Sequence, residues 1–211
     1  MVHPPTGNCS LLFIGQRELW VEPFHRLAVG LNGPSDFLHA SANFIAKRTM
    51  SVTEATPAVS ASSIPTIAKH LNQVVADSYG LLGQLHLAHW NVEGPHFLTL
   101  HQMFQAQYEE LFVAIDDLAE RVRALGEYAE GGVKRLAAMS NVEEGPTASP
   151  NAASDFVSSV LLAHEVVIAT ATEGRKVAAD AGDAETEDLL IARIQVHQKA
   201  VWFLNSYLKK G

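Results

Sequence analysis

Four long segments in the C-terminal part of this chain of 211 residues repeat apolar residues every three or four positions. This spacing places the apolar side chains on one face of an α-helix, and no segment shows the two-residue alternation of a half-buried strand. The segments span residues 64–90, 96–125, 154–181 and 184–209. The pattern therefore predicts an all-α protein built as a four-helix bundle.

The boundaries of these segments carry helix-start and helix-stop residues. Gly94 and Gly126 interrupt the periodicity, and Ser154 and Asp183 stand where N-caps of the third and fourth helices are expected. The longest connection joins the second and third segments and contains "VKRLAAM", residues 133–139, which can form a short helix. A connection of this length can return along the bundle, so the crossover of ferritin-like bundles is allowed.

The chain divides into two parts of different character. Residues 1–49 lack sustained periodicity, and a Ser/Thr/Ala/Pro-rich tract typical of a mobile arm follows from Met50. We expect an irregular extension and arm over residues 1–63 and the bundle domain over residues 64–211. One hypothesis is that residues 1–49 are an upstream translation and Met50 is the natural start. The alternative is a genuine extension that modifies the surface of the protein.

Amino-acid composition limits the cellular compartment and the classes of partner that we expect for this protein. No apolar run approaches the roughly 18 to 20 residues that cross a bilayer, and no signal peptide is evident, so we expect no membrane association. The single cysteine, Cys9, cannot form an internal disulfide and fits a reducing cytoplasm. The formal net charge of −8 repels nucleic acid and favours cations at clustered carboxylates.

Two carboxylates on the second segment are candidate metal ligands. Asp116 and Glu120 are four residues apart, so both lie on one helix face about one turn from each other. The alternative is that they face water or pair with Arg121 and Arg123. Spacing alone leaves both interpretations open.

Two histidines nearby in sequence could complete an iron site. His89 lies at the end of the first segment and His101 lies near the start of the second, and imidazoles together with carboxylates suit iron. However, His101 and Asp116 are fifteen residues apart on one helix, which is about 22 Å along its axis. Coordination distances are about 2 Å. A shared metal would therefore need histidines from one subunit and carboxylates from another, most simply across a twofold axis between antiparallel helices.

The same residues carry a family resemblance. The stretch "HWNVEGPHFLTLH", residues 89–101, is followed at matching intervals by Asp116 and by "DLAER", and it resembles the signature of the Dps family of mini-ferritins. With the "ETEDLL" and "VWFLNSYL" stretches, the resemblance covers about residues 64–210. It implies a ferritin-like four-helix subunit with a short extra helix between the second and third long helices, and a hollow dodecamer.

The resemblance also implies an activity and a ligand set. Members of the family oxidise Fe(II) at intersubunit ferroxidase sites, preferentially with hydrogen peroxide, and store the Fe(III) mineral, which protects the cell from oxidative damage. By this match, His89 and His101 are ligands from one subunit. Asp116 and Glu120 are ligands from its twofold partner.

Two positions depart from the common family pattern. Gln105 stands where many members have an aspartate, and His86 stands where many have a lysine. Gln105 is neutral and a poor ligand, which puts the second iron position in question. His86 could add a nitrogen ligand or bind zinc competitively. The alternative for His86 is a surface or interface histidine that is hydrogen-bonded to a neighbour.

Acidic residues crowd the start of the fourth segment. The resemblance makes Asp183 and Asp188 candidates for a threefold iron-entry pore. The alternative is simple capping and solvation, since a helix N-terminus favours negative charge.

Direct DNA binding is disfavoured. Some Dps members bind DNA through a Lys-rich tail, but residues 50–68 contain no Lys or Arg. A nucleoid-associated DNA-binding protein with weak or no iron chemistry is therefore the alternative function, and a catalytically silent helical scaffold is a third. The remaining conspicuous side chains are expected to be structural: His96 at a turn or interface, and His164, His197, Trp90 and Trp202 in packing.

Overall fold

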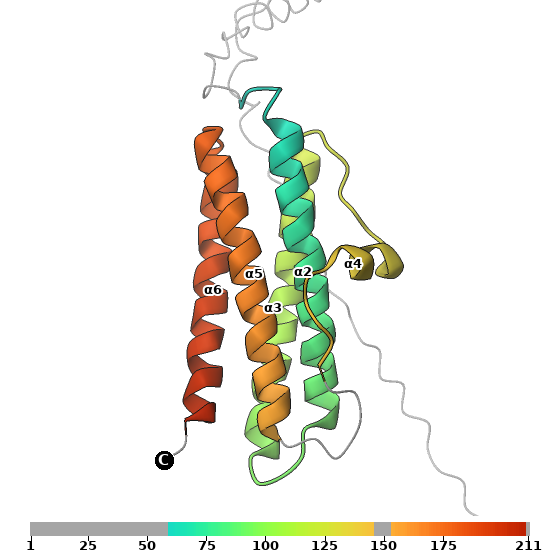
Figure 1. The fold of residues 1–211 in the computed structure, drawn as a ribbon, viewed down its shortest axis with the longest axis vertical. Coiled ribbons are helices and arrows are strands. Elements are labelled where there is room, and N and C mark those ends of the chain that lie inside the picture. The colour runs from blue at the N-terminus through green and yellow to red at the C-terminus, as the bar shows by residue number, and fades with distance from the viewer. Residues whose placement is uncertain (1–58, 146–152, 210–211) are drawn as a thin grey trace, which may run out of the picture. The chain divides into compact units, whose positions relative to one another are not determined.

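The computed structural model describes residues 59–145 and 153–209, and within these ranges it contains five α-helices and no strand (Figure 1). The all-α prediction is confirmed, and the short helix predicted from "VKRLAAM" is present as α4. The predictions about the extension and arm fall on residues 1–58 for the most part and lie outside the described residues. The helices are α2 (Ile64–Asn91), α3 (Phe97–Ala124), α4 (Val133–Met139), α5 (Ala153–Asp180) and α6 (Ala184–Leu208).

One of the two predicted caps is correct and the other is wrong. Asp183 caps α6, since its carboxylate accepts a hydrogen bond of 3.0 Å from the backbone N–H of Thr186. Ser154 is not a cap, because α5 already includes Ala153. Ser154 instead lies in the first turn, where its carbonyl accepts a hydrogen bond from the Ser158 hydroxyl.

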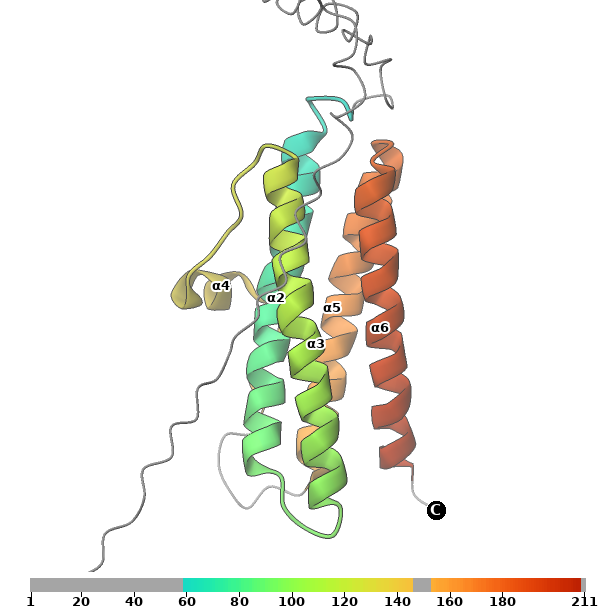
Figure 2. The same cartoon turned by 180° about the vertical axis from the view of Figure 1, so that it is seen from behind.

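The long connection returns the chain along the bundle, as a ferritin-like crossover requires. In Figures 1 and 2 the chain leaves α3 at one end of the bundle, passes through α4 on the outside of α2 and α3, and begins α5 at the opposite end. As a result, α5 runs parallel to α3, and α6 runs parallel to α2. Helix α5 packs extensively on α2 and α6, whereas α3 and α6 make few contacts with each other.

Polar side chains on α2 hold this connection in place. The carboxylate of Asp77, which is fully buried, accepts hydrogen bonds from the Asn141 backbone N–H (2.6 Å) and from the Thr170 hydroxyl of α5 (2.7 Å). Three other polar residues of α2 also form hydrogen bonds with backbone groups of residues 128–145, either as donors or as acceptors. They are Asn72, Gln73 and Gln84. The connection is therefore held by partly buried hydrogen bonds to its backbone groups.

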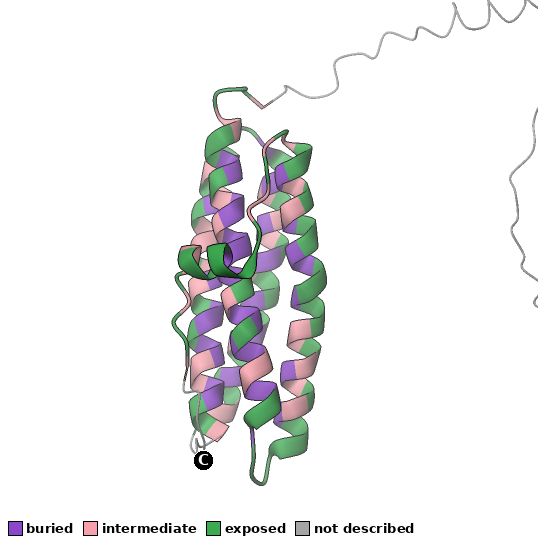
Figure 3. Cartoon of the chain, turned by 90° about the vertical axis from the view of Figure 1, so that its right-hand side faces the viewer, coloured by how far each residue is buried: buried purple, intermediate pink, exposed green. Residues whose placement is uncertain are grey.

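The apolar stripes meet along the axis of the bundle and form its core. Figure 3 shows buried residues on the inward sides of the long helices and exposed residues on their outer sides. Among the described helices, α5 alone is long and apolar enough to span a membrane by length and composition. Its apolar residues pack against α2 and α6, and a core helix of a bundle meets the same criterion. The largest fully buried side chains include Ile67, Leu71, Leu81, Leu85, Phe104 and Leu118.

Two buried histidines join three helices of the core. The Nδ1 atoms of His164 on α5 and His197 on α6 are 2.9 Å apart, and His164 Nε2 is 3.1 Å from Oε1 of Gln107 on α3. Burial, followed by the nearby charge of Arg193, lowers the pKa of His164 to about 3. Burial, followed by the charges of His164 and Arg193, lowers the pKa of His197 well below its ordinary value. Both are therefore neutral core residues, as predicted.

This burial predicts a specific loss of stability in acid. In the folded protein both histidines stay neutral well below pH 6.5, whereas in the unfolded chain each takes up a proton near its ordinary pKa of 6.5. The free energy of unfolding should therefore fall by up to about 1.4 kcal/mol per pH unit for each histidine as the pH drops below that value. Urea denaturation between about pH 4 and pH 7 at fixed protein concentration measures this slope.

The matched variant is His197→Leu, which replaces the imidazole by an apolar side chain and so removes one of the two titrating groups. Its slope over the same pH range should be shallower than that of the parent. The remaining polar and charged groups around the pair, namely Gln107, Glu110 and Arg193, are common to both proteins. Equal slopes would contradict the assignment.

Candidate metal-binding half-sites

The turn between α2 and α3 brings His89 and His101 together. The left-handed backbone of Gly94, with φ of 103°, reverses the chain between the two helices. Nδ1 of His89 lies 2.9 Å from the carbonyl oxygen of His101, and Nδ1 of His101 lies 2.9 Å from the carbonyl oxygen of His89. The His89 carbonyl belongs to the last turn of α2 and has no partner further along that helix, so the imidazole of His101 also satisfies a free helix end.

These reciprocal hydrogen bonds fix the tautomer of both rings. A carbonyl oxygen can only accept, so each Nδ1 must carry the proton, and each neutral imidazole presents an Nε2 lone pair. The rings are stacked with centroids 3.7 Å apart, and the ring of Tyr108 meets His89 edge-on at 5.2 Å. Histidine ligands of metals are oriented in this way, by a hydrogen bond from the second ring nitrogen. The pair is therefore prepared to donate two nitrogens to a metal ion.

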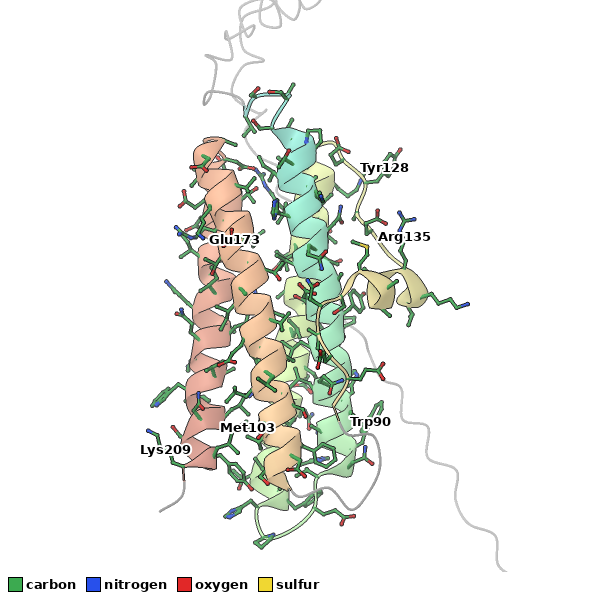
Figure 4. All side chains as sticks on the ribbon, viewed as in Figure 1. Trp90, Met103, Tyr128, Arg135, Glu173 and Lys209 are labelled. Carbon is green, nitrogen blue, oxygen red and sulfur yellow. The ribbon has the colours of Figure 1, made fainter. Side chains whose placement is uncertain are left out.

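His86 lies beside this pair and is enclosed by aromatic rings. Its imidazole stacks on Trp90 at 5.3 Å and meets Tyr108 edge-on at 4.6 Å. Burial, followed by the charge of His89, lowers the pKa of His86 and favours the neutral form that can bind a metal. Trp90 and Trp202 were expected to pack, but both side chains are mostly exposed in the single chain, and Trp90 projects from the bundle where α2 ends (Figure 4).

Gln105 follows His101 by one helical turn on α3. Its amide nitrogen donates a hydrogen bond of 2.7 Å to Oε1 of Glu109, one further turn along. The neutral amide therefore holds a carboxylate on the same helix as the histidine. Gln105 itself offers an amide oxygen in place of the carboxylate common in the family.

The carboxylates of Asp116 and Glu120 are exposed on α3, and the neighbouring arginines are engaged elsewhere. Arg121 donates to the Asp183 carboxylate at 2.6 Å and to Thr186, and Arg123 donates to a backbone carbonyl of the following turn. Within residues 59–145 and 153–209, neither Asp116 nor Glu120 takes part in an ion pair. Of the alternative that they face water or pair with Arg121 and Arg123, the pairing is therefore wrong, whereas both carboxylates do face solvent in the single chain.

The histidines and the carboxylates occupy different places on the bundle. The fifteen residues between His101 and Asp116 form one continuous helix, so the helical rise separates them by about 22 Å. In the part of the chain that the structure describes, no three His, Cys, Asp or Glu side chains lie close enough to hold a metal ion. The four candidate ligands thus form two half-sites, one of nitrogens and one of oxygens.

The carboxylate half-site lies at the edge of an apolar groove. Asp116 lines a groove of about 460 Å³ between α2, α3 and α4, together with Tyr79, Phe112 and Val113. The side chains of Phe112 and Val113 are 67% and 61% exposed. Phe97 and Phe112 belong to the apolar pattern of residues 96–125 that predicts the second helix, yet both side chains are exposed in the single chain. Large apolar side chains gathered around a groove mark a surface that another molecule covers.

The two acidic pore candidates differ in their surroundings. The carboxylate of Asp183 is fully buried, where it accepts from Thr186 and pairs with Arg121. A carboxylate enclosed in this way cannot line a pore, so the pore assignment of Asp183 is corrected to the capping alternative. Asp188 is exposed on the first turns of α6 and remains a candidate for the threefold iron-entry pore.

Comparison with known proteins places this geometry in context. A protein-family model described as a ferritin-like domain matches residues 68–211. DNA protection during starvation protein 2 of Bacillus anthracis is 32% identical over 140 residues, which are 66% of this chain and 94% of that protein. The crystal structure of a Dps protein from Bacillus brevis is 34% identical and covers 70% of this chain and 98% of its own, with a TM-score of 0.67.

A second similar structure comes from Vibrio cholerae O1. It is a DPS protein described as a member of a broad superfamily of ferritin-like diiron-carboxylate proteins. It is 26% identical to this chain, covers 71% of this chain and 92% of its own length, and has a TM-score of 0.66. The curated relative and both structures match nearly their whole length to the region that contains the bundle.

Proposed function

Because the chain belongs to the Dps family of ferritin-like proteins, we propose that it oxidises Fe(II) at sites shared between subunits and stores the Fe(III) product as mineral inside a hollow dodecamer. The observation that carries this proposal is the histidine pair, in which reciprocal hydrogen bonds leave Nε2 of His89 and His101 free for a metal. The uncompensated carboxylates of Asp116 and Glu120 supply the second half of the site.

A twofold axis between two α3 helices completes the site. When two copies of α3 run antiparallel across such an axis, His101 of one faces Asp116 of the other if the axis passes near the midpoint between them. That midpoint is at Tyr108 and Glu109. The exposed side chain of Phe112 lies one turn away, so the apolar surface around it would be buried by the same contact. Each dimer would then hold two equivalent sites.

Iron is the substrate at this site. Imidazole nitrogens together with carboxylates bind Fe(II), and oxygen ligands favour the Fe(III) product. Each Fe(II) gives up one electron, and two such electrons, together with two protons, reduce one hydrogen peroxide molecule to two water molecules. Fe(III) then hydrolyses to the mineral and releases protons. A preference for hydrogen peroxide over dioxygen would remove both Fe(II) and peroxide, which together produce damaging radicals. This removal is the protective role that we propose for the protein, and we propose that it acts in the cytoplasm.

The neighbouring metal position is where this chain departs from its family. His86 presents a neutral imidazole beside the histidine pair, and Gln105 offers only an amide oxygen. A nitrogen-rich set of this kind also suits zinc, which prefers nitrogen and sulfur ligands. We therefore propose that His86 contributes to the second position and that zinc competes with iron there. The exposed carboxylate of Asp188 is proposed to line the threefold entry pore.

The proposed protection from oxidative damage does not require the protein to bind DNA. A similar protein is named for DNA protection, but the charge of this chain is −8 and residues 50–68 carry no Lys or Arg. Both features disfavour binding to a phosphate backbone. The nucleoid-associated alternative predicts retardation of DNA in a gel, with a steep dependence on salt.

The first test measures iron oxidation. Fe(II) is loaded anaerobically and a measured pulse of hydrogen peroxide is added to the parent, His101→Ala and Asp116→Ala. Loss of either ligand should slow the initial formation of Fe(III) at least about tenfold. Asp117→Ala is the matched control, because Asp117 is the adjacent exposed carboxylate and should leave the rate unchanged. Equal rates in all four proteins would rule out the proposed site.

A second test asks whether the ligands come from different chains. Refolding an equal mixture of His101→Ala and Asp116→Ala gives heterodimers in which one of the two sites has all of its ligands. About a quarter of all sites should therefore be intact and the mixture should regain activity in that proportion. Each variant refolded alone is the control. No recovery in the mixture, despite heterodimers shown by mass spectrometry, would exclude a site shared across the twofold axis.

A third test addresses the interface. Phe112→Glu places a charge near the proposed twofold axis and should dissociate the dimer, because burial of an unpaired charge is strongly unfavourable. Leu162→Glu changes an exposed apolar residue of α5 and is the matched control. Light scattering reports the mass of each assembly, and circular dichroism reports the helical content. A Phe112→Glu protein of unchanged mass would refute this position of the axis.

A further inference from the structure

A second groove lies between α3 and α6, away from the histidine pair at the turn. Its volume is about 150 Å³ and its walls are mainly apolar, contributed by Leu111, Val196, Ala200 and Phe203. His164 and His197 also line it, and both imidazoles are almost completely buried. The groove forms where α3 and α6 make few direct contacts. None of these residues has a part in the proposed iron site.

The hydrogen bonds around the two histidines determine what the groove presents to a ligand. The amide oxygen of Gln107 only accepts, so Nε2 of His164 carries a proton and its Nδ1, in a neutral ring, has a lone pair. Nδ1 of His197 must then donate to Nδ1 of His164 across 2.9 Å. In neutral His197, this leaves a lone pair on Nε2.

This Nε2 atom is the unused acceptor of the chain of hydrogen bonds. It makes no hydrogen bond to any residue that the structure describes, yet it is not among the buried polar atoms sealed from solvent. His197 lines this groove together with Gln107, Glu110 and Lys199, so its free Nε2 is the acceptor that a ligand in the groove could reach. A ligand with an O–H or N–H group could satisfy it, since buried acceptors favour a partner.

The surrounding charges decide between a cation and a neutral molecule. Lys199 lines the groove and carries a positive charge, which opposes a cation at this point. The guanidinium of Arg193 also acts on both histidines and lowers their pKa. The Glu110 carboxylate at the groove is held by both terminal nitrogens of Arg193, so it is not free to bind a cation. Apolar walls and a neutral acceptor are instead complementary to an uncharged molecule.

We propose that this groove binds a small, neutral, monocyclic phenol, with its ring against Phe203 and Leu111 and its hydroxyl donating to Nε2 of His197. An apolar cavity of about 150 Å³ accommodates a benzene-sized ring. The hydroxyl adds the one hydrogen bond that the groove lacks. The site is separate from iron oxidation, and its occupancy can be measured on metal-free protein.

The test compares 4-fluorophenol with 4-fluoroanisole, which has the same ring but no donor hydrogen. Binding to the full-length, assembled protein is followed by broadening of the ¹⁹F resonance during titration. The phenol should bind about tenfold more tightly than the anisole, which is the fold-change that corresponds to the net gain of one hydrogen bond. This comparison uses the unaltered protein and does not depend on the folding of a variant.

Two variants then locate the site. His197→Phe should abolish the difference between the two probes, because it removes the acceptor and keeps a ring in its place. Leu162→Ala changes an exposed apolar residue of α5 that does not line the groove, and should preserve the difference. Thermal denaturation checks that both variants are folded.

The outcomes separate cleanly. Tighter binding of the phenol that is lost in His197→Phe supports the proposal. Equal binding of the two probes overturns it, because the hydrogen bond to Nε2 would then contribute nothing. The absence of binding by either probe also overturns it, and includes the case in which another copy of the chain covers the groove in the assembly.

Discussion

The fixed rise of an uninterrupted α-helix is the constraint on which the functional interpretation of this bundle depends. Helix α3 begins next to the histidine pair and carries the two candidate carboxylates beyond its midpoint, and nothing within it bends the chain back. At 1.5 Å per residue, the two ligand groups cannot meet inside one chain. One chain therefore cannot bring the four candidate ligands together, and the proposed metal site would need a second subunit.

The two proposed half-sites differ in how firmly the single chain orients their side chains. The histidines are oriented before any metal arrives, because each ring donates to the backbone of the other residue and aromatic rings pack around them. The carboxylates are held only by the helix and remain exposed. An interface that covers the apolar groove beside Asp116 would change this, since burial would restrict the carboxylates and strengthen their attraction for a cation. Assembly and metal affinity should for this reason be coupled.

The sequence predicted the helices well because their signals are local. Periodicity located the four long helices, and the cap at Asp183 was predictable from residue type and position. The exposure of Phe112 was not predictable in this way, because an apolar stripe does not distinguish a face that packs within the chain from one that packs on another copy. The hydrogen bonds of Asp77 were also missed, since they join α2 to residues more than sixty positions away and leave no periodic pattern.

The charged residues of this bundle fall into two groups, those that find an ion-pair or hydrogen-bond partner within the described part of the chain and those that lack an ion pair there. Asp183 pairs with Arg121, Arg193 pairs with Glu110, and Asp77 receives several hydrogen bonds, so these groups stabilise the subunit itself. A buried charge without such partners would be strongly destabilising. Asp116 and Glu120 lack intrachain ion pairs within the described residues, although two arginines follow them closely in sequence. Because those arginines are committed to other partners, the two carboxylates keep the negative charge that a metal ion and a second subunit can use.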